Sequence, residues 1–113
     1  MQASALSFFS SSSSQRWESV GQSVRRQVLT HDDQLMLVKV AFERGGIGSR
    51  HRHFQTQLTY VESGVFTVSV GDEKRVVVAG DTFLIPSDVW HGVECIEAGV
   101  LLDVFSPPRP EFL

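Results

Sequence analysis

The sequence predicts a single domain of all-β fold, and three observations support this prediction. The chain has 113 residues, which is enough for one domain with its own core and too few for two ordinary domains. Its apolar residues form short stretches, some alternating with polar residues as in Phe66-Thr67-Val68-Ser69-Val70, the period of a half-buried strand. Turn-forming residues separate the stretches, and none repeats with helical period over a helical length. About nine short strands at this spacing are typical of a β-sandwich or barrel.

The chain begins with a segment of different character. A short apolar patch at residues 5–9 is followed by an unbroken serine run at residues 10–14. Serine tracts bury little surface and commonly stay flexible. We therefore expect a flexible serine-rich leader over residues 1–15 and a barrel domain over residues 16–113. The leader has neither the positively charged start nor the long apolar stretch of a secretory signal.

The strands of the barrel domain are expected, in chain order, at residues 24–29, 35–42, 50–53, 57–62, 65–70, 75–78, 82–85, 89–96 and 100–105. Between them lie residues that favour turns: His31-Asp32-Asp33, Gly45-Gly46, Ser63-Gly64, Gly71-Asp72, Gly80-Asp81, Pro86-Ser87-Asp88 and Ala98-Gly99. The first strand would leave an open sheet edge unless it is paired, which leads us to predict a homodimer.

Composition excludes several classes of partner. The net charge of −3 argues against a nucleic-acid binder, because such proteins carry an excess of positive charge. No apolar run approaches the roughly 20 residues of a membrane-spanning helix, so no membrane partner is expected. A single cysteine, Cys95, excludes an internal disulfide and a multi-cysteine zinc site. These features predict a cytoplasmic protein.

Three of the four histidines form a candidate metal site. His51 and His53 are two residues apart on an expected strand, so both imidazoles project from one face. His91 follows a proline turn early in a later strand and would supply a third nitrogen ligand. Arg50 and Arg52 have the opposite parity and point to the other face.

The segments around these histidines resemble the paired motifs of the cupin superfamily. The first motif, G-x5-H-x-H-x3-[E/Q]-x6-G, is matched by Gly45, His51, His53, Gln57 and Gly64. The second, G-x5-P-x-G-x2-H-x3-N, is matched by Gly80, Pro86 and His91. This resemblance implies a single-domain jelly-roll barrel, also called a double-stranded β-helix, with a metal bound by His51, His53, Gln57 and His91.

The chain departs from the cupin pattern at three positions. Gln57 replaces the commoner glutamate, Asp88 replaces the glycine of the second motif, and Cys95 replaces its asparagine. Gln55 competes with Gln57 as fourth ligand, because strand parity alone would place Gln55 on the face of the histidines; we favour Gln57. A ligand set of three histidines and a glutamine is neutral and leaves a divalent ion its full charge. We expect one such ion per subunit, Ni, Zn, Fe or Mn.

The last expected strand carries a second group of candidate residues. Asp103 and Phe105 share one face of it, and an aspartate inside an otherwise apolar strand is a candidate acid or base. Arg109 follows two prolines and would return over the mouth of the barrel to hold a carboxylate.

Together with the glutamine ligand, the segment Asp-Val-Phe-Ser-Pro-Pro-Arg resembles the KdgF family of pectin-degradation cupins. That family converts 4,5-unsaturated monouronates, released from pectin or alginate, into linear ketouronates. The resemblance implies that Asp103, Phe105 and Arg109 serve the active site and that the partner is a small anionic sugar. Two alternatives stay open: a dioxygenase with Fe(II) on three histidines, and a non-catalytic cupin that binds or senses an acidic small molecule.

Overall fold

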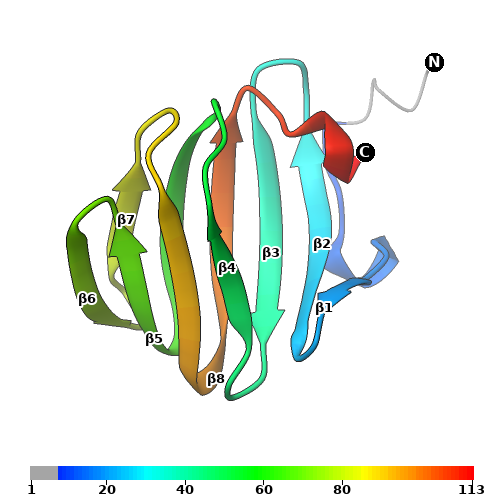
Figure 1. Cartoon of the computed structure of the whole chain (residues 1–113). Helices are drawn as coiled ribbons and strands as arrows, with labels where there is room; N and C mark the ends of the chain where they lie inside the picture. The colour runs from blue at the N-terminus through cyan, green and yellow to red at the C-terminus, as the bar shows by residue number, and fades with distance from the viewer. Residues whose placement is uncertain (1–7) are drawn as a thin grey trace.

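The computed structural model describes residues 8–113 and confirms the all-β prediction (Figure 1). The strands are β1 (Glu18–Gly21), β2 (Val24–His31), β3 (Met36–Phe42), β4 (Ile47–His51), β5 (Thr56–Val70), β6 (Glu73–Val78), β7 (Thr82–Ile85) and β8 (His91–Ser106). Two short 3-10 turns, η2 (Ser12–Ser14) and η3 (Pro110–Phe112), lie near the two ends of the chain. Within residues 8–113 no helix has the length and hydropathy that a membrane crossing requires.

All strand pairs are antiparallel, and β8 is the centre of the sheet. The strand order is β1-β2-β3-β8-β5-β6, with β4 paired to β8 and β7 paired to β5. The long strands β5 and β8 run beside each other from Thr56↔Ser106 to Val70↔His91. The sheet curls around their inner faces into a barrel (Figure 1), which is the jelly-roll architecture that the cupin resemblance implies.

Two expected turns are wrong. Ser63-Gly64 and Ala98-Gly99 do not end strands: the chain continues through both as bends inside β5 and β8. The pairing register shifts around Ser63, and Gly64 has a φ of +88°. A Cβ on Gly64 would lie 2.6 Å from the Cα of Gly99. The two glycines therefore allow the strands to cross closely, where the sequence pattern predicted two chain reversals.

The expected open edge at the first strand is also corrected. β1, which the sequence reading did not anticipate, pairs with β2 from Glu18↔Arg26 to Gly21↔Val24. The first half of β2 is thus covered by this chain itself, and β1 takes the edge position. An unpaired edge at this part of β2 therefore no longer supports a homodimer, and the homodimer stays a prediction.

Part of the serine run lies along β2. Gln27, which is almost fully buried, donates from Nε2 to the carbonyl oxygens of Ser12 and Gln15 and accepts from the Ser12 hydroxyl. The Ser10 hydroxyl bonds to the carbonyl oxygen of Leu29. Residues 1–7 lie outside the described residues, so the leader over residues 1–15 and the domain boundary stay predictions.

The apolar core has two parts. The larger cluster includes Phe42, Phe66 and Leu101, with the Phe42 and Phe66 rings edge to face at 5.2 Å. The smaller cluster contains Met36, Val38 and Phe105. Six buried polar side chains belong to neither cluster: Gln27, Gln55, Gln57, Thr59, His91 and Asp103. A polar site is therefore built into the wall of the barrel.

Candidate metal centre

Three imidazoles from separate parts of the chain meet inside the barrel. His51 ends β4, His91 begins β8, and the two are a cross-strand pair. His53 lies just beyond the end of β4, so the expected strand at residues 50–53 ends earlier than predicted. The ring centroids are 4.4 Å apart for His51 and His91, 4.8 Å for His53 and His91, and 5.4 Å for His51 and His53. Their candidate ligand atoms all lie within 4.8 Å of one another.

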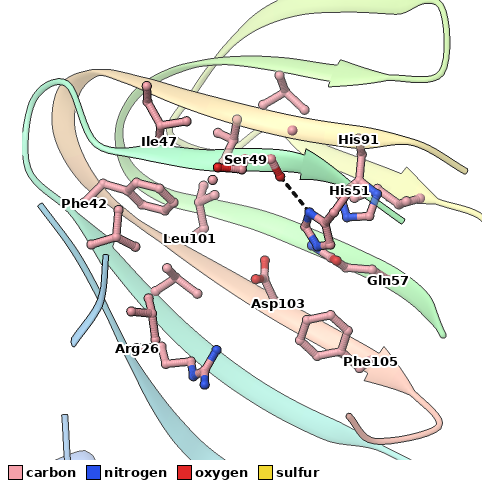
Figure 2. Close-up of a pocket in the computed structure, with 18 of the residues that line it drawn as sticks. Arg26, Phe42, Ile47, Ser49, His51, Gln57, His91, Leu101, Asp103 and Phe105 are labelled. Atoms are coloured by element: carbon pink, nitrogen blue, oxygen red, sulfur yellow. Dashed lines mark hydrogen bonds between the residues drawn. The ribbon is translucent and has the colours of Figure 1, made fainter. Parts of the chain in front are cut away.

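Each imidazole is oriented by a backbone carbonyl. Nδ1 of His51 lies 2.7 Å from the Ser49 oxygen, and Nδ1 of His91 lies 2.9 Å from the Val89 oxygen. Nδ1 of His53 lies 3.1 Å from the Gln55 oxygen. Because a carbonyl only accepts, each Nδ1 carries the proton and each Nε2 keeps a lone pair. Figure 2 shows the bond that orients His51. This is how proteins orient histidines that bind metals.

The two glutamine candidates have different surroundings. Oε1 of Gln57 lies 3.1 Å from Nε2 of His53, beside the imidazoles (Figure 2). The side chain of Gln55 donates instead to the carbonyl oxygen of Pro108, at 3.3 Å. Gln57 is thus the glutamine whose side chain lies with the histidines, on β5 and after a bend at Phe54 and Gln55.

A hydrogen-bond relay fixes the orientation of the Gln57 amide. Nε2 of Gln57 donates to the Thr59 hydroxyl at 3.0 Å, and that hydroxyl donates to Oδ1 of Asp103 at 2.7 Å. Thr59 and Asp103 are cross-strand neighbours on β5 and β8, and Thr59 is fully buried. Since a hydroxyl has a single proton, Thr59 must accept from Gln57 while it donates to Asp103. The amide oxygen of Gln57 is therefore turned toward the imidazoles.

This arrangement leaves lone pairs facing one another. Nε2 of His53 and Oε1 of Gln57 are both acceptors, yet they are 3.1 Å apart. Nε2 of His91 is buried and has no hydrogen-bond partner among residues 8–113. Burial lowers the pKa of His91 to about 4, and burial together with the charge of Arg109 lowers the pKa of His53. Since burial disfavours protonation of His53 and His91, a metal cation would satisfy these acceptors, and three nitrogens with one amide oxygen fit a divalent transition metal.

The departure at Asp88 has a local explanation. Asp88 has a φ of +62°, a left-handed conformation that favours glycine but which aspartate tolerates better than most residues. Its N–H donates to the carbonyl oxygen of His53 at 2.8 Å. The turn before His91 is thereby attached to the loop that carries His53, and the second motif keeps its shape without its glycine.

Asp103 and Phe105 face the same pocket as the imidazoles. The pocket has a volume of about 360 Å³, and its lining includes His51, Gln57, His91, Asp103, Phe105 and Arg109. Asp103 is the single carboxylate among the lining residues described (Figure 2). Burial raises the pKa of Asp103 to about 6, against the opposing effects of the Thr59 hydrogen bond and the charge of Arg109. The ring of Phe105 lies edge to face with His53, with centroids 5.7 Å apart.

Arg109 returns to the pocket after Pro107 and Pro108, as the sequence predicts, and lies over the Phe105 ring at 5.4 Å. Its Nε and one terminal nitrogen both bond to Oε2 of Glu111, at 3.0 and 2.9 Å. The Arg109 guanidinium thus donates to a carboxylate of the same chain, and its geometry suits a carboxylate as partner.

The sequence reading missed Thr59 as the link between Gln57 and Asp103. Its parity with Gln57 on one strand was a usable signal, but the pairing with Asp103 joins residues 44 positions apart. It also missed Arg26 and Phe112, which line the pocket from β2 and η3.

Comparisons with known proteins agree with this geometry. A family model described as "Cupin domain" matches residues 38–105. The pectin degradation protein KdgF of Dickeya dadantii (strain 3937) is 41% identical over 99 residues, which cover 86% of this chain and 90% of that protein. The chain belongs to the KdgF family of the cupin superfamily.

Solved structures of cupins match over almost the whole chain. A RmlC-like cupin from Shewanella frigidimarina NCIMB 400 superposes with a TM-score of 0.91 at 38% identity, covering 95% of this chain and 96% of that one. The structure of KdgF from Halomonas sp. gives a TM-score of 0.90 at 34% identity, covering 95% and 99%. This cupin therefore has the family's fold along nearly all of its length, and three histidines placed to hold a metal ion.

Proposed function

We propose that this cupin is a metal-dependent enzyme that opens the ring of 4,5-unsaturated monouronates, sugars released from pectin or alginate, to give linear ketouronates. One observation carries the proposal: a buried carboxyl with raised pKa, a guanidinium and two imidazoles of the three-histidine cluster line one pocket. The pocket volume of about 360 Å³ is within the range of small-molecule sites. The name of the relative from Dickeya dadantii supports a role in pectin degradation.

The metal would be held by His51, His53, Gln57 and His91. When bound, a divalent ion supplies Lewis-acid stabilisation of the negative charge that develops on the substrate's enol oxygen. The four ligand groups are neutral, so they leave the charge of such an ion available to an anionic ligand. The expected ions are still Ni, Zn, Fe or Mn.

Asp103 would act as base and then as acid. In the substrate, the ring oxygen links C1 to C5 of the C4=C5 double bond. Asp103 takes the proton of the hydroxyl on C1, the C1–O bond breaks as the C1 aldehyde forms, and the bond's electron pair remains on the oxygen of C5. The same carboxyl then gives the proton to C4, which leaves a ketone at C5. One proton moves from oxygen to carbon and no electrons are lost, so a single carboxyl with a pKa near 6 suits both steps.

Arg109 and Phe105 would position the substrate. In this assignment the substrate carboxylate takes the place of Glu111 at the Arg109 guanidinium, whose planar group matches a carboxylate. Phe105 offers the apolar face on which a sugar ring packs. Thr59 keeps both Gln57 and Asp103 in position from behind.

The direct experiment follows the ultraviolet absorbance of the conjugated double bond. Adding the metal-loaded protein to an unsaturated monouronate should accelerate its loss, equally with and without oxygen. His91→Gln should abolish the acceleration, whereas His31→Gln, at the exposed end of β2, should leave it unchanged. No acceleration by metal-loaded protein would contradict the proposal. A rate that depends on oxygen would favour a dioxygenase, and tight binding without turnover would favour a sensor.

The cellular location and the oligomeric state of the protein are also proposals. We predict a cytoplasmic protein, in keeping with a single buried and unpaired cysteine, Cys95. We also predict a homodimer.

A further inference from the structure

Arg26 is a second arginine of the pocket. It lies on β2, where its neighbours in sequence, Arg25 and Gln27, have the opposite parity. The cross-strand partner of Arg26 is Val40, and the partner of Val40 is Leu101 of β8. Arg26 therefore starts two strand spacings, about 10 Å, from the strand that carries Asp103. Its side chain is only 20% exposed and lines the pocket, and Figure 2 shows it on the opposite side of Asp103 from the labelled histidines.

The surroundings of Arg26 repeat those of Arg109. Both guanidinium carbons lie over the ring of Phe112, at 3.7 Å for Arg26 and 4.5 Å for Arg109. Each guanidinium pairs with an exposed glutamate through Nε and one terminal nitrogen: Arg26 with Glu18 at 2.9 Å, and Arg109 with Glu111. The glutamates orient the two guanidinium groups from the solvent side, and stacking on the Phe112 ring restricts the rotation of both.

Most of the N–H groups of the Arg26 guanidinium have no acceptor within the described residues. A guanidinium has five N–H groups in a fixed plane, and Glu18 takes one from Nε and one from a terminal nitrogen. The remaining N–H groups have no partner among residues 8–113. The pocket wall described here contains two guanidinium groups against one carboxylate, Asp103. It therefore favours ligands rich in oxygen and negative charge, although the whole chain has a net charge of −3.

The two arginines are placed differently relative to the imidazoles. Arg109 lies over the ring of Phe105, which packs edge to face against His53, whereas Arg26 lies over Phe112 and on the far side of Asp103 from the labelled histidines (Figure 2). From the imidazoles the wall continues through Phe105 to Phe112, whose ring centroids are 5.7 Å apart, and then to Arg26. A ligand whose carboxylate is held at Arg109 can therefore present its hydroxyl groups to Arg26, because both guanidinium groups lie over the ring of Phe112.

We propose that Arg26 is a substrate-binding residue that forms a second subsite, away from the imidazoles, for the hydroxyl oxygens of a six-carbon sugar acid. The carboxylate of that ligand is held at Arg109. The proposal deepens the proposed function, because it assigns recognition of the hydroxyl groups of the sugar to a residue outside the cupin motifs.

The test compares two ligands and two arginine variants. D-galacturonate, a saturated monouronate, carries a carboxylate and several hydroxyl groups, and acetate carries a carboxylate without any hydroxyl. Their affinities for metal-loaded wild type, Arg26→Gln and Arg25→Gln are measured by titration calorimetry. Arg25 is the matched control: it is adjacent on β2, loses the same charge, and stacks on Trp17 outside the pocket.

We expect Arg26→Gln to weaken galacturonate binding at least about tenfold, as for lost hydrogen bonds from a charged group, and to leave acetate binding within twofold. Arg25→Gln should alter neither. Arg26→Lys keeps the charge but loses the planar donors, so it should weaken galacturonate binding to an intermediate degree. It replaces Arg26→Gln in the comparison if that variant has a lowered melting temperature. Equal galacturonate affinities for the three arginine variants and wild type, or no galacturonate binding by wild type, would overturn the proposal.

This outcome is separate from that of the ring-opening assay. If wild type opens the unsaturated sugar and Arg26→Gln does so with unchanged KM, the Arg26 subsite fails while the proposed function stands. If galacturonate binding responds to Arg26 as expected but no sugar is opened, the subsite stands and the proposed reaction fails.

Discussion

At the scale of single residues, the positions of the protons on His53 and Gln57 determine which atoms face the metal site. His53 and Gln57 turn acceptors toward each other because Gln55 and Thr59 take their donors. Such a contact is unfavourable without a positive charge between or beside the two atoms. The orientation of these acceptors therefore suits the binding of a cation beside both of them.

Thr59 provides a direct test of this reasoning. Thr59→Val removes the hydroxyl with little change in shape, so Gln57 is free to turn its amide. We expect metal affinity to fall about 10- to 100-fold, the usual effect of losing a group that orients a ligand. Thr59→Ser keeps the hydroxyl and should restore most of the affinity, and Thr67→Val, also on β5, should have no effect. Competition with a chelator measures the affinity, and equal values for Val and Ser at position 59 would contradict the role.

The buried carboxyl of Asp103 should lower the stability of the fold at neutral pH. Its pKa is raised from 3.8 to about 6, so the folded protein holds this proton more tightly than the unfolded chain. The stability that the proton provides is complete below pH 4 and is lost as the pH rises through 6. Asp103→Asn should therefore stabilise metal-free protein above pH 6, by at most about 3 kcal/mol, and the gain should disappear near pH 4. Denaturant unfolding at several pH values checks this.

The same variant should lose activity. Without a group that takes and returns a proton, ring opening should slow by at least about 100-fold, while metal content stays unchanged. An Asp103→Asn variant with near wild-type turnover would remove the aspartate from the mechanism.

At the scale of the elements, the crossing of β5 and β8 decides the shape of the barrel. Gly99 lies against Ser63 and Gly64, and a Cβ on Gly99 would overlap the carbonyl oxygen of Ser63. Because the obstacle is backbone in the middle of two long strands, a side chain cannot be accommodated by a rotamer change.

Gly99→Ala should accordingly destabilise the fold by several kcal/mol, on the order of 3. Gly80→Ala is the control: Gly80 has a φ of +96° but nothing within 4 Å of a new Cβ, so its cost should stay near 1 kcal/mol. Thermal unfolding of both variants measures the difference. Equal losses would mean that the crossing has room that the structure does not indicate.

The elements also show what sequence reasoning can predict. Alternation located most strand segments, and motif spacing identified His51, His53, Gln57 and His91 as a group, because these signals are local or nearly so. The bends at Ser63-Gly64 and Ala98-Gly99 resembled turns, since a small residue followed by glycine is common in turns and in bends of strands. The Thr59–Asp103 contact and the place of Arg26 in the pocket depend on which strands become neighbours, and that information is not contained in any short segment.

At the scale of the whole molecule, the site lies where the two core clusters leave space in the barrel. Strands β4, β5 and β8 and the loop between β4 and β5 contribute its ligands, and β2 with η3 closes its far side. The rigid crossing of long strands holds groups that are distant in sequence, and the C-terminal segment adds the arginine that an anionic ligand requires. Assembly is the remaining property at this scale. Light scattering should give the mass of two subunits, and the mass of one subunit would contradict the predicted homodimer.

The central claim is that three imidazoles and one carboxamide share a single metal ion. The most direct measurement is a crystal structure of metal-loaded protein with anomalous scattering data at the absorption edge of that metal. The account predicts one strong peak per subunit, within bonding distance of Nε2 of His51, His53 and His91 and of Oε1 of Gln57. A peak elsewhere, or an imidazole cluster without a peak after loading, would contradict it.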